Sequence, residues 1–320
     1  MSVAAPIVAL SNIIIDDVWL ADGTHQGQSI GGAAVWAAVG ARAWWPRVGI
    51  AAGVGEDLST VTKGALRNIG LLADGETVRH ARTIQSRLVY ASDGIRTETP
   101  AFGQEHFRGL QLTPAEIAPS LLPAAGTYIF RDLWPHFWEA FRGRRTDLGF
   151  TLWELQGDIA KKECWPEVRA LLPELDIVSV NQAEGERLLG SRDPLVQTKD
   201  FLGAGAHVVI VRMGADGALI SSRAGSVRLI PPRTPVIDVT GGGNAFCGGF
   251  LAGWCMKPGD LEHASRCAAG SAALAIAQVG LPPWEQLSTA AQIAQRAEVS
   301  HMAQIGLTPE TGSSHVGQGV

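Results

Sequence analysis

Short apolar runs alternate along most of the chain with longer segments of helical periodicity. The run at residues 7–15 is almost continuously apolar, which is typical of a strand covered on both faces, and it ends at Asp16 and Asp17. The same pattern predicts further strands at residues 47–52, 127–130, 148–153, 177–180 and 208–211. Helices are predicted at residues 33–43, 58–69, 134–142, 165–172, 182–189 and 195–202. Strands separated by helices of this length predict parallel βαβ units in an α/β fold.

Two segments depart from this alternation. Residues 81–100 alternate as a half-exposed strand does, and the turn residues Ser92, Asp93 and Gly94 in their middle predict a hairpin. A hairpin inserted into strand–helix alternation indicates a small β lid over the sheet edge, which we expect to comprise residues 13–28 and 81–101. A second hairpin is expected at residues 218–222 and 226–230, and two long helices at residues 244–256 and 261–279. We expect a single domain over residues 1–320, with residues 311–320 as a flexible tail.

Composition and charge narrow the class of protein. The chain has 320 residues, of which 46% are apolar and 18% charged, so it can bury a substantial core. Its formal charge of −5 gives no electrostatic reason to expect nucleic acid or an anionic membrane as partner. The four cysteines lack CxxC spacing, and we find neither a signal peptide nor a run long enough to span a membrane. We therefore expect a reduced, cytoplasmic protein that acts on a small molecule.

The most distinctive stretch is residues 238–246, in which Gly241, Gly242 and Gly243 precede a predicted helix. A glycine loop that opens a helix directs several backbone N–H groups to one spot at the positive end of the helix dipole, which suits a phosphate. A tight strand-to-helix turn is the simpler interpretation. Three consecutive glycines lose more conformational entropy on folding than other residues do, so stability alone does not favour them.

Two further motifs each allow two interpretations. Asn181 follows a predicted strand and Glu184 stands three positions later, which fits a helix capping box or a pair that holds hydrated Mg²⁺ beside a phosphate. Arg212, Gly214 and Gly217 follow another predicted strand. They form either a turn into the next hairpin or one wall of a nucleotide site. Neither motif decides between its two interpretations alone.

The order of the motifs resembles the ribokinase-like (PfkB-type) family of sugar and nucleoside kinases over nearly the whole chain. The matching segments are Ser11 to Asp16 with the family's first strand, Gly31-Gly32 with its Gly-Gly motif, Gly53 to Asp57 with GxVGxD, Asn181 to Glu184 with NxxE, Gly214 to Gly217 with GxxG, and Asp238 to Phe250 with DTxGAGDxFxGGF. The resemblance implies a central, mostly parallel sheet flanked by helices in three layers, with a small β lid. It also implies that ATP binds near the GxxG turn and the C-terminal helices.

The resemblance assigns roles to individual residues. Asp16, Gly31 and Gly32 would bind the substrate, and Gly241, Gly242 and Gly243 the transferring phosphoryl group. Asn181 and Glu184 would hold Mg²⁺ through water, and Arg212, Gly214 and Gly217 would border the nucleotide. Asp238 and the carbonyl of Thr240 are candidates for the monovalent-cation site, for K⁺, that some relatives have.

Two positions depart from the family pattern. The catalytic Asp of GAGD falls on Asn244, and an amide cannot accept the proton of an attacking hydroxyl, a loss worth roughly 10²- to 10⁴-fold in rate. The sugar-binding Asn of GGxxxN falls on Trp36, which offers a stacking face instead of a hydroxyl partner. Asn244 as a simple helix cap and Trp36 as a core residue are the alternatives. The GGGN loop also resembles that of a divergent fungal branch, the maintenance-of-killer-like proteins.

Several residues near predicted strand ends are candidates to line the substrate pocket: Asp132, Trp134, His136, Trp153 and Glu154. Asp132 and Glu154 could replace the missing base if they reach the reacting hydroxyl, although packing or solvation is the simpler role. Two functions stay open at this point. One is an ATP-dependent phosphotransferase acting on a sugar-like or nucleoside-like hydroxyl. The other is a non-kinase or pseudokinase relative that keeps the site for sensing, partner binding or another reaction. A homodimer through the lid edges is compatible with either.

Overall fold

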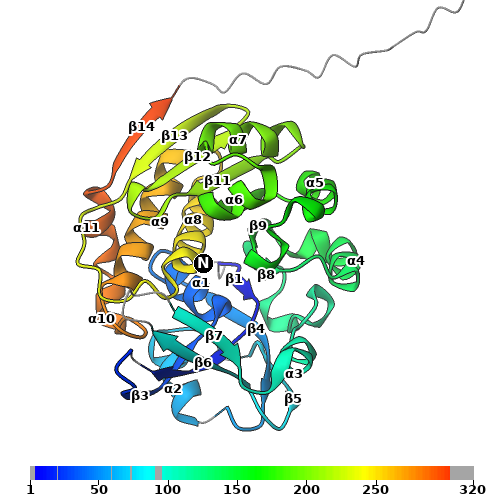
Figure 1. The fold of residues 1–320 in the computed structure, drawn as a ribbon, viewed down its shortest axis with the longest axis vertical. Helices are drawn as coiled ribbons and strands as arrows, with labels where there is room; N and C mark the ends of the chain where they lie inside the picture. The colour runs from blue at the N-terminus through cyan, green and yellow to red at the C-terminus, as the bar shows by residue number, and fades with distance from the viewer. Residues whose placement is uncertain (1–3, 20, 59, 73, 91–95, 303–320) are drawn as a thin grey trace, which may run out of the picture.

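A ten-stranded, mostly parallel sheet forms the centre of the protein (Figure 1). The computed structural model describes residues 4–19, 21–58, 60–72, 74–90 and 96–302. The strand order is β14-β13-β12-β11-β10-β9-β8-β1-β4-β5, and only the strands beyond β11 run antiparallel to their neighbours. The strands are β1 (Ile7–Leu10), β4 (Val48–Gly55), β5 (Glu76–His80), β8 (Gly126–Arg131), β9 (Phe150–Leu155), β10 (Ile177–Asn181), β11 (Val208–Arg212), β12 (Ala218–Ser222), β13 (Gly225–Ile230) and β14 (Glu298–Met302).

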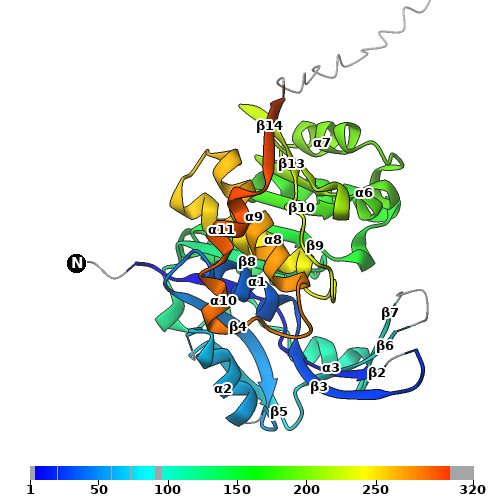
Figure 2. The ribbon, with the colours of Figure 1, turned by 90° about the vertical axis from the view of Figure 1, so that its left-hand side faces the viewer.

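Helices cover both faces of this sheet, which gives the three layers expected from the sequence (Figures 1 and 2). One face packs against α1 (Ala33–Arg42), α8 (Gly242–Met256), α9 (Leu261–Ile276) and α11 (Ala290–Gln295). The other packs against α4 (Pro135–Arg144), α5 (Trp165–Leu171), α6 (Gln182–Leu189) and α7 (Pro194–Gly203). The remaining helices are α2 (Thr60–Asn68), α3 (Gly103–Gly109) and α10 (Trp284–Leu287).

The continuous apolar character of the central strands follows from this double cover. In β8, Tyr128 belongs to the core beneath α1 and α8, whereas Ile129 belongs to the core beneath α4. In β9, Leu152 and Trp153 divide in the same way. Successive side chains of a strand point to opposite faces, so a strand buried on both sides has to be apolar at every position.

A separate four-stranded sheet, in the order β3-β2-β6-β7, projects from the carboxyl edge of the central sheet (Figure 2). It consists of β2 (Ile14–Trp19), β3 (His25–Gly31), β6 (Ile84–Tyr90) and β7 (Arg96–Pro100). β2, β6 and β7 lie within the two segments predicted as lid elements, whereas β3 continues past the predicted end at residue 28 to Gly31. The predicted turn residues Ser92, Asp93 and Gly94 lie outside the described residues, as does the predicted tail. That this sheet closes as a lid, or pairs with a second copy, stays a prediction.

The first predicted strand is wrong in one respect. The apolar run at residues 7–15 is not one strand, because β1 ends at Leu10 and β2 begins at Ile14 in the other sheet. Asp16 consequently lies within the small sheet and not at the end of a central strand. The apolar pattern hides this change of direction because the chain stays buried through it: Ile13 is 0% and Ile14 8% exposed.

Other boundaries differ from the prediction, and several elements were not predicted. Strand β4 continues through Gly55, beyond its predicted end at residue 52, and the long helix α9 ends at Ile276, short of 279. The sequence analysis missed β5, α3, α10, α11 and β14. β5 and β14 lie at the two edges of the central sheet and are largely exposed, so they lack the apolar pattern of a buried strand.

Helices α1 and α8 cross at unusually close range because glycines stand at the contact. A Cβ atom at Gly40 of α1 would overlap the carbonyl of Ala245, and one at Gly248 of α8 would overlap the carbonyl of Ala37. The close approach fixes the N-terminal half of α8 against residues 37–40 of α1. It therefore determines the relative position of Asn244 and Trp36.

We expect Gly248→Ala to lower the free energy of unfolding by about 1–3 kcal/mol, because the added methyl group overpacks this contact. The matched control is Gly143→Ala in α4, where a Cβ meets nothing within 4 Å. That change should be neutral or stabilising by up to about 1 kcal/mol, since alanine favours the helix. Urea unfolding of both variants tests the prediction. Equal effects of the two substitutions would contradict it.

Candidate active site

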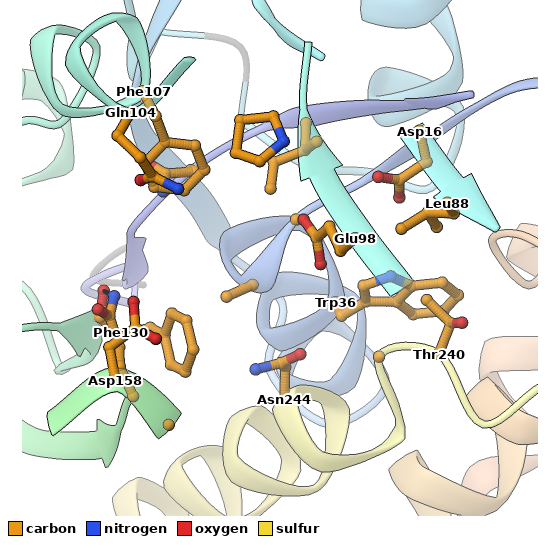
Figure 3. Close-up of a pocket in the computed structure, with 18 residues that line it drawn as sticks. Asp16, Trp36, Leu88, Glu98, Gln104, Phe107, Phe130, Asp158, Thr240 and Asn244 are labelled. Atoms are coloured by element: carbon orange, nitrogen blue, oxygen red, sulfur yellow. Dashed lines mark hydrogen bonds between the residues drawn. The ribbon is translucent and has the colours of Figure 1, made fainter. Parts of the chain in front are cut away.

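A cavity of about 390 Å³ opens where the small sheet faces the carboxyl edge of the central sheet (Figure 3). Residues distant in sequence line it: Asn12, Ile14, Asp16, Gly32, Ala33, Trp36, Leu88, Glu98, Pro100, Gln104, Phe107, Phe130, Gln156, Gly157, Asp158, Thr240, Gly241 and Asn244. The carboxyl edge of a parallel sheet is the usual place for ligands in open α/β folds. The geometry thus brings the predicted substrate and phosphate elements to one cavity.

The glycine loop forms the N-terminus of α8. Gly241 is its N-cap, with a φ of 73° that favours glycine, and the Gly242 N–H donates to the carbonyl of Val239 (3.2 Å). The N–H groups of Gly243 and Asn244 lie in the first helical turn, where an α-helix supplies no acceptor of its own. This arrangement suits an anion.

Packing also requires two of the three glycines. A Cβ at Gly241 would overlap the indole of Trp36, and one at Gly243 would overlap the guanidinium of Arg212. The loop therefore lies between an aromatic side chain and a cation. Sequence reasoning identified the glycines but not these neighbours, which come from α1 and β11.

Asn244 is held by a buried carboxylate. Its Nδ2 donates to Glu154 Oε2 (3.1 Å) and to the hydroxyl of Tyr128 (3.0 Å). A carboxylate only accepts hydrogen bonds, so the amide nitrogen faces Glu154, and Oδ1 is the atom of this side chain available to the cavity. An amide oxygen in that position accepts a hydrogen bond from a hydroxyl but takes no proton from it.

Glu154 is the centre of a buried polar network. Its Oε1 pairs with Arg212 Nη2 (2.8 Å), and its Oε2 accepts from the Tyr128 hydroxyl (2.7 Å) as well as from Asn244. Burial, and then the charge of Glu154, raise the pKa of Tyr128 well above its usual value. Burial tends to lower the pKa of Arg212, but Glu154 together with the nearby Cys247, Glu184 and Tyr128 outweighs burial and raises it. The Arg212 guanidinium therefore stays charged beside Glu154 Oε1.

Neither of the carboxylates considered as an alternative base, Glu154 and Asp132, lines the cavity. Glu154 is 3% exposed, lies behind Asn244 and does not line the cavity. With three donors on its two oxygens, it has little capacity to take a substrate proton. Asp132 is not a lining residue either: its Oδ1 accepts from the Trp134 N–H (3.2 Å) in a local turn. Among the other pocket candidates, Trp153 is fully buried in the core beneath α4.

Asp16, Gly32 and Trp36 also line the cavity, and Trp36 lies between Asp16 and Thr240 (Figure 3). A Cβ at Gly31 would overlap the Asp16 carboxylate, and Gly32, with a φ of 97°, is the N-cap of α1. Trp36 is 4% exposed, and its Nε1 has no hydrogen-bond partner among the described residues. The indole thus presents both a face and a donor to a ligand.

The Asn181–Glu184 motif makes the capping box that the simpler interpretation predicts. Asn181 Oδ1 accepts from the Glu184 N–H (2.8 Å), and Glu184 Oε2 accepts from the Asn181 N–H (2.9 Å). Burial raises the pKa of Glu184, and the nearby charge of Arg212 opposes this shift. Asn181 and Arg212 are register partners at the ends of β10 and β11. A role in holding Mg²⁺ stays a prediction.

The remaining predicted positions lie on turns. Gly214 and Gly217, with φ of 59° and 86°, begin and end a short turn of 3-10 helix, and a Cβ at Gly217 would overlap the carbonyl of Leu229. Asp238 Oδ1 accepts from the Thr240 N–H (2.9 Å), and Thr240 lines the cavity. Among the described residues, no three His, Cys, Asp or Glu side chains gather as a metal site. None of the described helices is long and apolar enough to cross a membrane.

Sequence reasoning missed several lining residues. Gln156 and Asp158 directly follow β9, so the rule that strand ends line sites could have identified them. Glu98 and Gln104 come from β7 and α3, and no signal in the sequence predicts that they face the glycine loop.

Comparison with known proteins shows what the chain is similar to. Residues 158–285 match the model of the pfkB family carbohydrate kinases. The crystal structure of adenosine kinase from Sinorhizobium meliloti has the same fold, with a TM-score of 0.75 at 22% identity over 91% of this chain and 99% of that one. The match to the pfkB family thus covers residues 158–285, and the likeness to solved structures shows a ribokinase-like fold over most of the chain.

Two curated relatives show how unevenly the similarity is distributed along the chain. An ATP-dependent 6-phosphofructokinase from Thermoanaerobacterium thermosaccharolyticum is 36% identical over 86 residues, which is 27% of each chain. A cytidine kinase from Thermococcus kodakarensis is 26% identical over 256 residues, covering 78% of this chain and 88% of the kinase. The relatives thus include a sugar-phosphate kinase and a nucleoside kinase. The likeness to the fungal branch stays a prediction.

Proposed function

We propose that this chain is an ATP-dependent phosphotransferase that acts on a hydroxyl of a sugar-like or nucleoside-like molecule, and that its transfer step is slow. One observation carries the proposal: the N-terminus of α8 and the buried Asp16 carboxylate line the same cavity. Transfer of a phosphoryl group to an alcohol requires a site for the anion and a group that accepts a hydrogen bond from the alcohol, both facing the same space.

The first turn of α8 has the chemistry to hold the transferring group. The Gly243 and Asn244 N–H groups, the helix dipole and Arg212 beside Gly243 all favour negative charge. ATP, named in the 6-phosphofructokinase relative, supplies that phosphoryl group when bound. Asp16 would accept a hydrogen bond from one substrate hydroxyl, and Asn244 Oδ1 would orient another without removing its proton.

Asn181 and Glu184 would hold Mg²⁺ through water on the nucleotide side of the loop. Burial disfavours the charged form of Glu184, as its raised pKa shows, and a nearby divalent cation would favour that form. The capping box is compatible with this role, because each carboxylate or amide oxygen can accept a second hydrogen bond from a water molecule on the metal. Asp238 and the Thr240 carbonyl are the corresponding proposal for K⁺.

Glu184→Gln separates capping from metal binding. Glutamine keeps an oxygen that can accept from the Asn181 N–H but removes the charge, so we expect stability within about 0.5 kcal/mol of wild type and at least tenfold weaker binding of Mg-ATP. Glu184→Ala removes both, so it should also lose about 1 kcal/mol of stability. Thermal unfolding and calorimetry of the two variants provide the measurements. Unchanged Mg-ATP affinity in Glu184→Gln would remove this residue from the metal site.

The proposed function itself is tested by ADP formation with a panel of sugars and nucleosides. We expect at least one compound to stimulate ADP formation by wild-type protein above the rate without acceptor, at a rate well below that of a kinase with an intact base. The hydrogen bond from Asn244 to Glu154 favours one other function, that of a pseudokinase that binds nucleotide without transferring its phosphoryl group. Mg-ATP binding with no acceptor-dependent ADP formation across the panel would support that function and reject ours.

A further inference from the structure

The cavity is acidic. Three carboxylates line it: Asp16 from β2, Glu98 from β7 and Asp158 from the turn after β9. Asp16 is buried at 6% exposure, whereas Glu98 and Asp158 are exposed at the rim. Of the residues described as lining the cavity, none is Lys, Arg or His.

Three arginines near the cavity contact other groups, and Arg187 Nη2 lies 3.9 Å from where a Cβ at Gly157 would be. Arg212 is paired with Glu154 and lies against Gly243, on the phosphoryl side of the loop. Arg131, at the end of β8, lies over the rings of Trp134 and Phe137. Arg87 of β6 lies over Trp19. None of these three cations lines the acceptor cavity.

Two buried polar atoms of the cavity wall indicate what the ligand offers. Asn12 Oδ1 and Trp36 Nε1 have no hydrogen-bond partner among the described residues, and both side chains are 4% exposed. One is an acceptor and the other a donor, and buried polar atoms of this kind are normally satisfied. A hydroxyl group donates and accepts, so a hydroxylated ligand satisfies both. The rings of Trp36, Phe107 and Phe130 add apolar surface for a ring face.

We propose that the acceptor of this site is an unphosphorylated hydroxylated ring compound, uncharged or positively charged, and that the cavity rejects sugar phosphates. This proposal rests on the proposed function. It favours an acceptor like that of the nucleoside kinase relative over one like that of the sugar-phosphate kinase relative. A substrate phosphate needs a cation or several N–H donors at its binding place. The first turn of α8 supplies such donors where the transferring phosphoryl group would bind, and elsewhere in the cavity a substrate phosphate would meet carboxylates. Amino sugars and nucleosides meet no such repulsion.

The test measures binding to the full chain without nucleotide, by calorimetry or tryptophan fluorescence. The probes are pentoses, hexoses, amino sugars and nucleosides, together with the phosphate ester of each sugar and amino sugar. We expect at least one unphosphorylated compound to bind, and its phosphate ester to bind at least about 100-fold more weakly. A phosphate ester that binds as tightly as its parent would overturn the proposal, and so would a panel in which no unphosphorylated compound binds.

Two variants connect the result to the cavity. Glu98→Gln combined with Asp158→Asn removes the two rim charges and should reduce the discrimination against phosphate esters at least about fivefold. Trp36→Phe keeps a ring but removes the hydrogen-bond donor, and should lower the affinity for the bound compound by about 3- to 10-fold. If the rim variant discriminates against phosphate esters as strongly as the wild type does, the two rim charges are not the cause of the discrimination. Because Mg-ATP is absent from these assays, failure here leaves the phosphotransferase proposal standing, and failure of Mg-ATP binding leaves the acceptor class standing.

Discussion

The double substitution Asn244→Asp with Glu154→Gln should raise the rate of phosphoryl transfer by roughly 10²- to 10⁴-fold, the usual contribution of a positioned general base. The two positions exchange their roles in this variant. The aspartate introduced at position 244 becomes the carboxylate, and the glutamine introduced at position 154 becomes the amide that donates to it. The net charge beside Arg212 is unchanged. The new carboxylate then presents an oxygen that can take the proton of the acceptor hydroxyl.

The single substitution Asn244→Asp should give much less, at most about a tenfold gain, because the new carboxylate would be largely protonated. Asn244 Nδ2 lies 3.1 Å from Glu154 Oε2, so an aspartate there would put two carboxylate oxygens at hydrogen-bond distance. Carboxylates this close share a proton, which raises the pKa of one of them strongly. A protonated aspartic acid that donates to Glu154 would reproduce the hydrogen bond of the amide and could not act as base.

Steady-state ADP formation with the best acceptor of the wild type checks both statements. Glu154→Gln alone is the matched control, and it should not exceed the wild-type rate because Asn244 still supplies no base. Equal gains from the single and the double variant would show that Glu154 does not restrict position 244. A double variant no faster than wild type would show that the missing base does not limit the rate.

The buried ion pair gives the largest expected effect on stability. Glu154→Ala leaves the Arg212 charge without its partner, so we expect a loss of about 3–5 kcal/mol in the free energy of unfolding. Arg212→Met should cost a similar amount, because it strands the Glu154 carboxylate at 3% exposure. The double variant Glu154→Leu with Arg212→Met should lose less than the sum of the two single losses, since no unpaired charge stays buried.

Chemical unfolding of these variants measures the coupling directly. The control is Glu186→Ala, which removes the exposed pair of Glu186 and Arg192, with side chains 42% and 67% exposed. Exposed pairs contribute about 0–1 kcal/mol, so this change should be small. Additive losses in the Glu154 and Arg212 double variant would mean that the two side chains stabilise the fold independently.

The sequence predicted what local chemistry determines. The capping box at Asn181 and Glu184 follows from spacing alone, and helix α6 has the predicted bounds. The glycine loop was placed at a helix N-terminus for the same reason. The alternation of strands and helices between residues 126 and 212 is also local, because each strand is buried on both faces.

What the sequence could not show depends on contacts between distant segments. Asn244 and Glu154 are 90 residues apart, so nothing local indicates that a carboxylate holds the amide. The passage from β1 to β2 is hidden because residues Ser11 to Ile14 stay buried while the chain changes sheets. Glu98 faces the cavity only because the small sheet folds over it.

The central proposal is that this site can hold the phosphoryl donor and lacks the base that activates the acceptor. Titration calorimetry with Mg-ATP on the wild type and on the Asn244→Asp, Glu154→Gln double variant tests it most directly. The account predicts one nucleotide bound per chain in both proteins, with affinities within about threefold, because the binding groups are backbone N–H groups and Arg212. Folded wild-type protein that binds no Mg-ATP would contradict it.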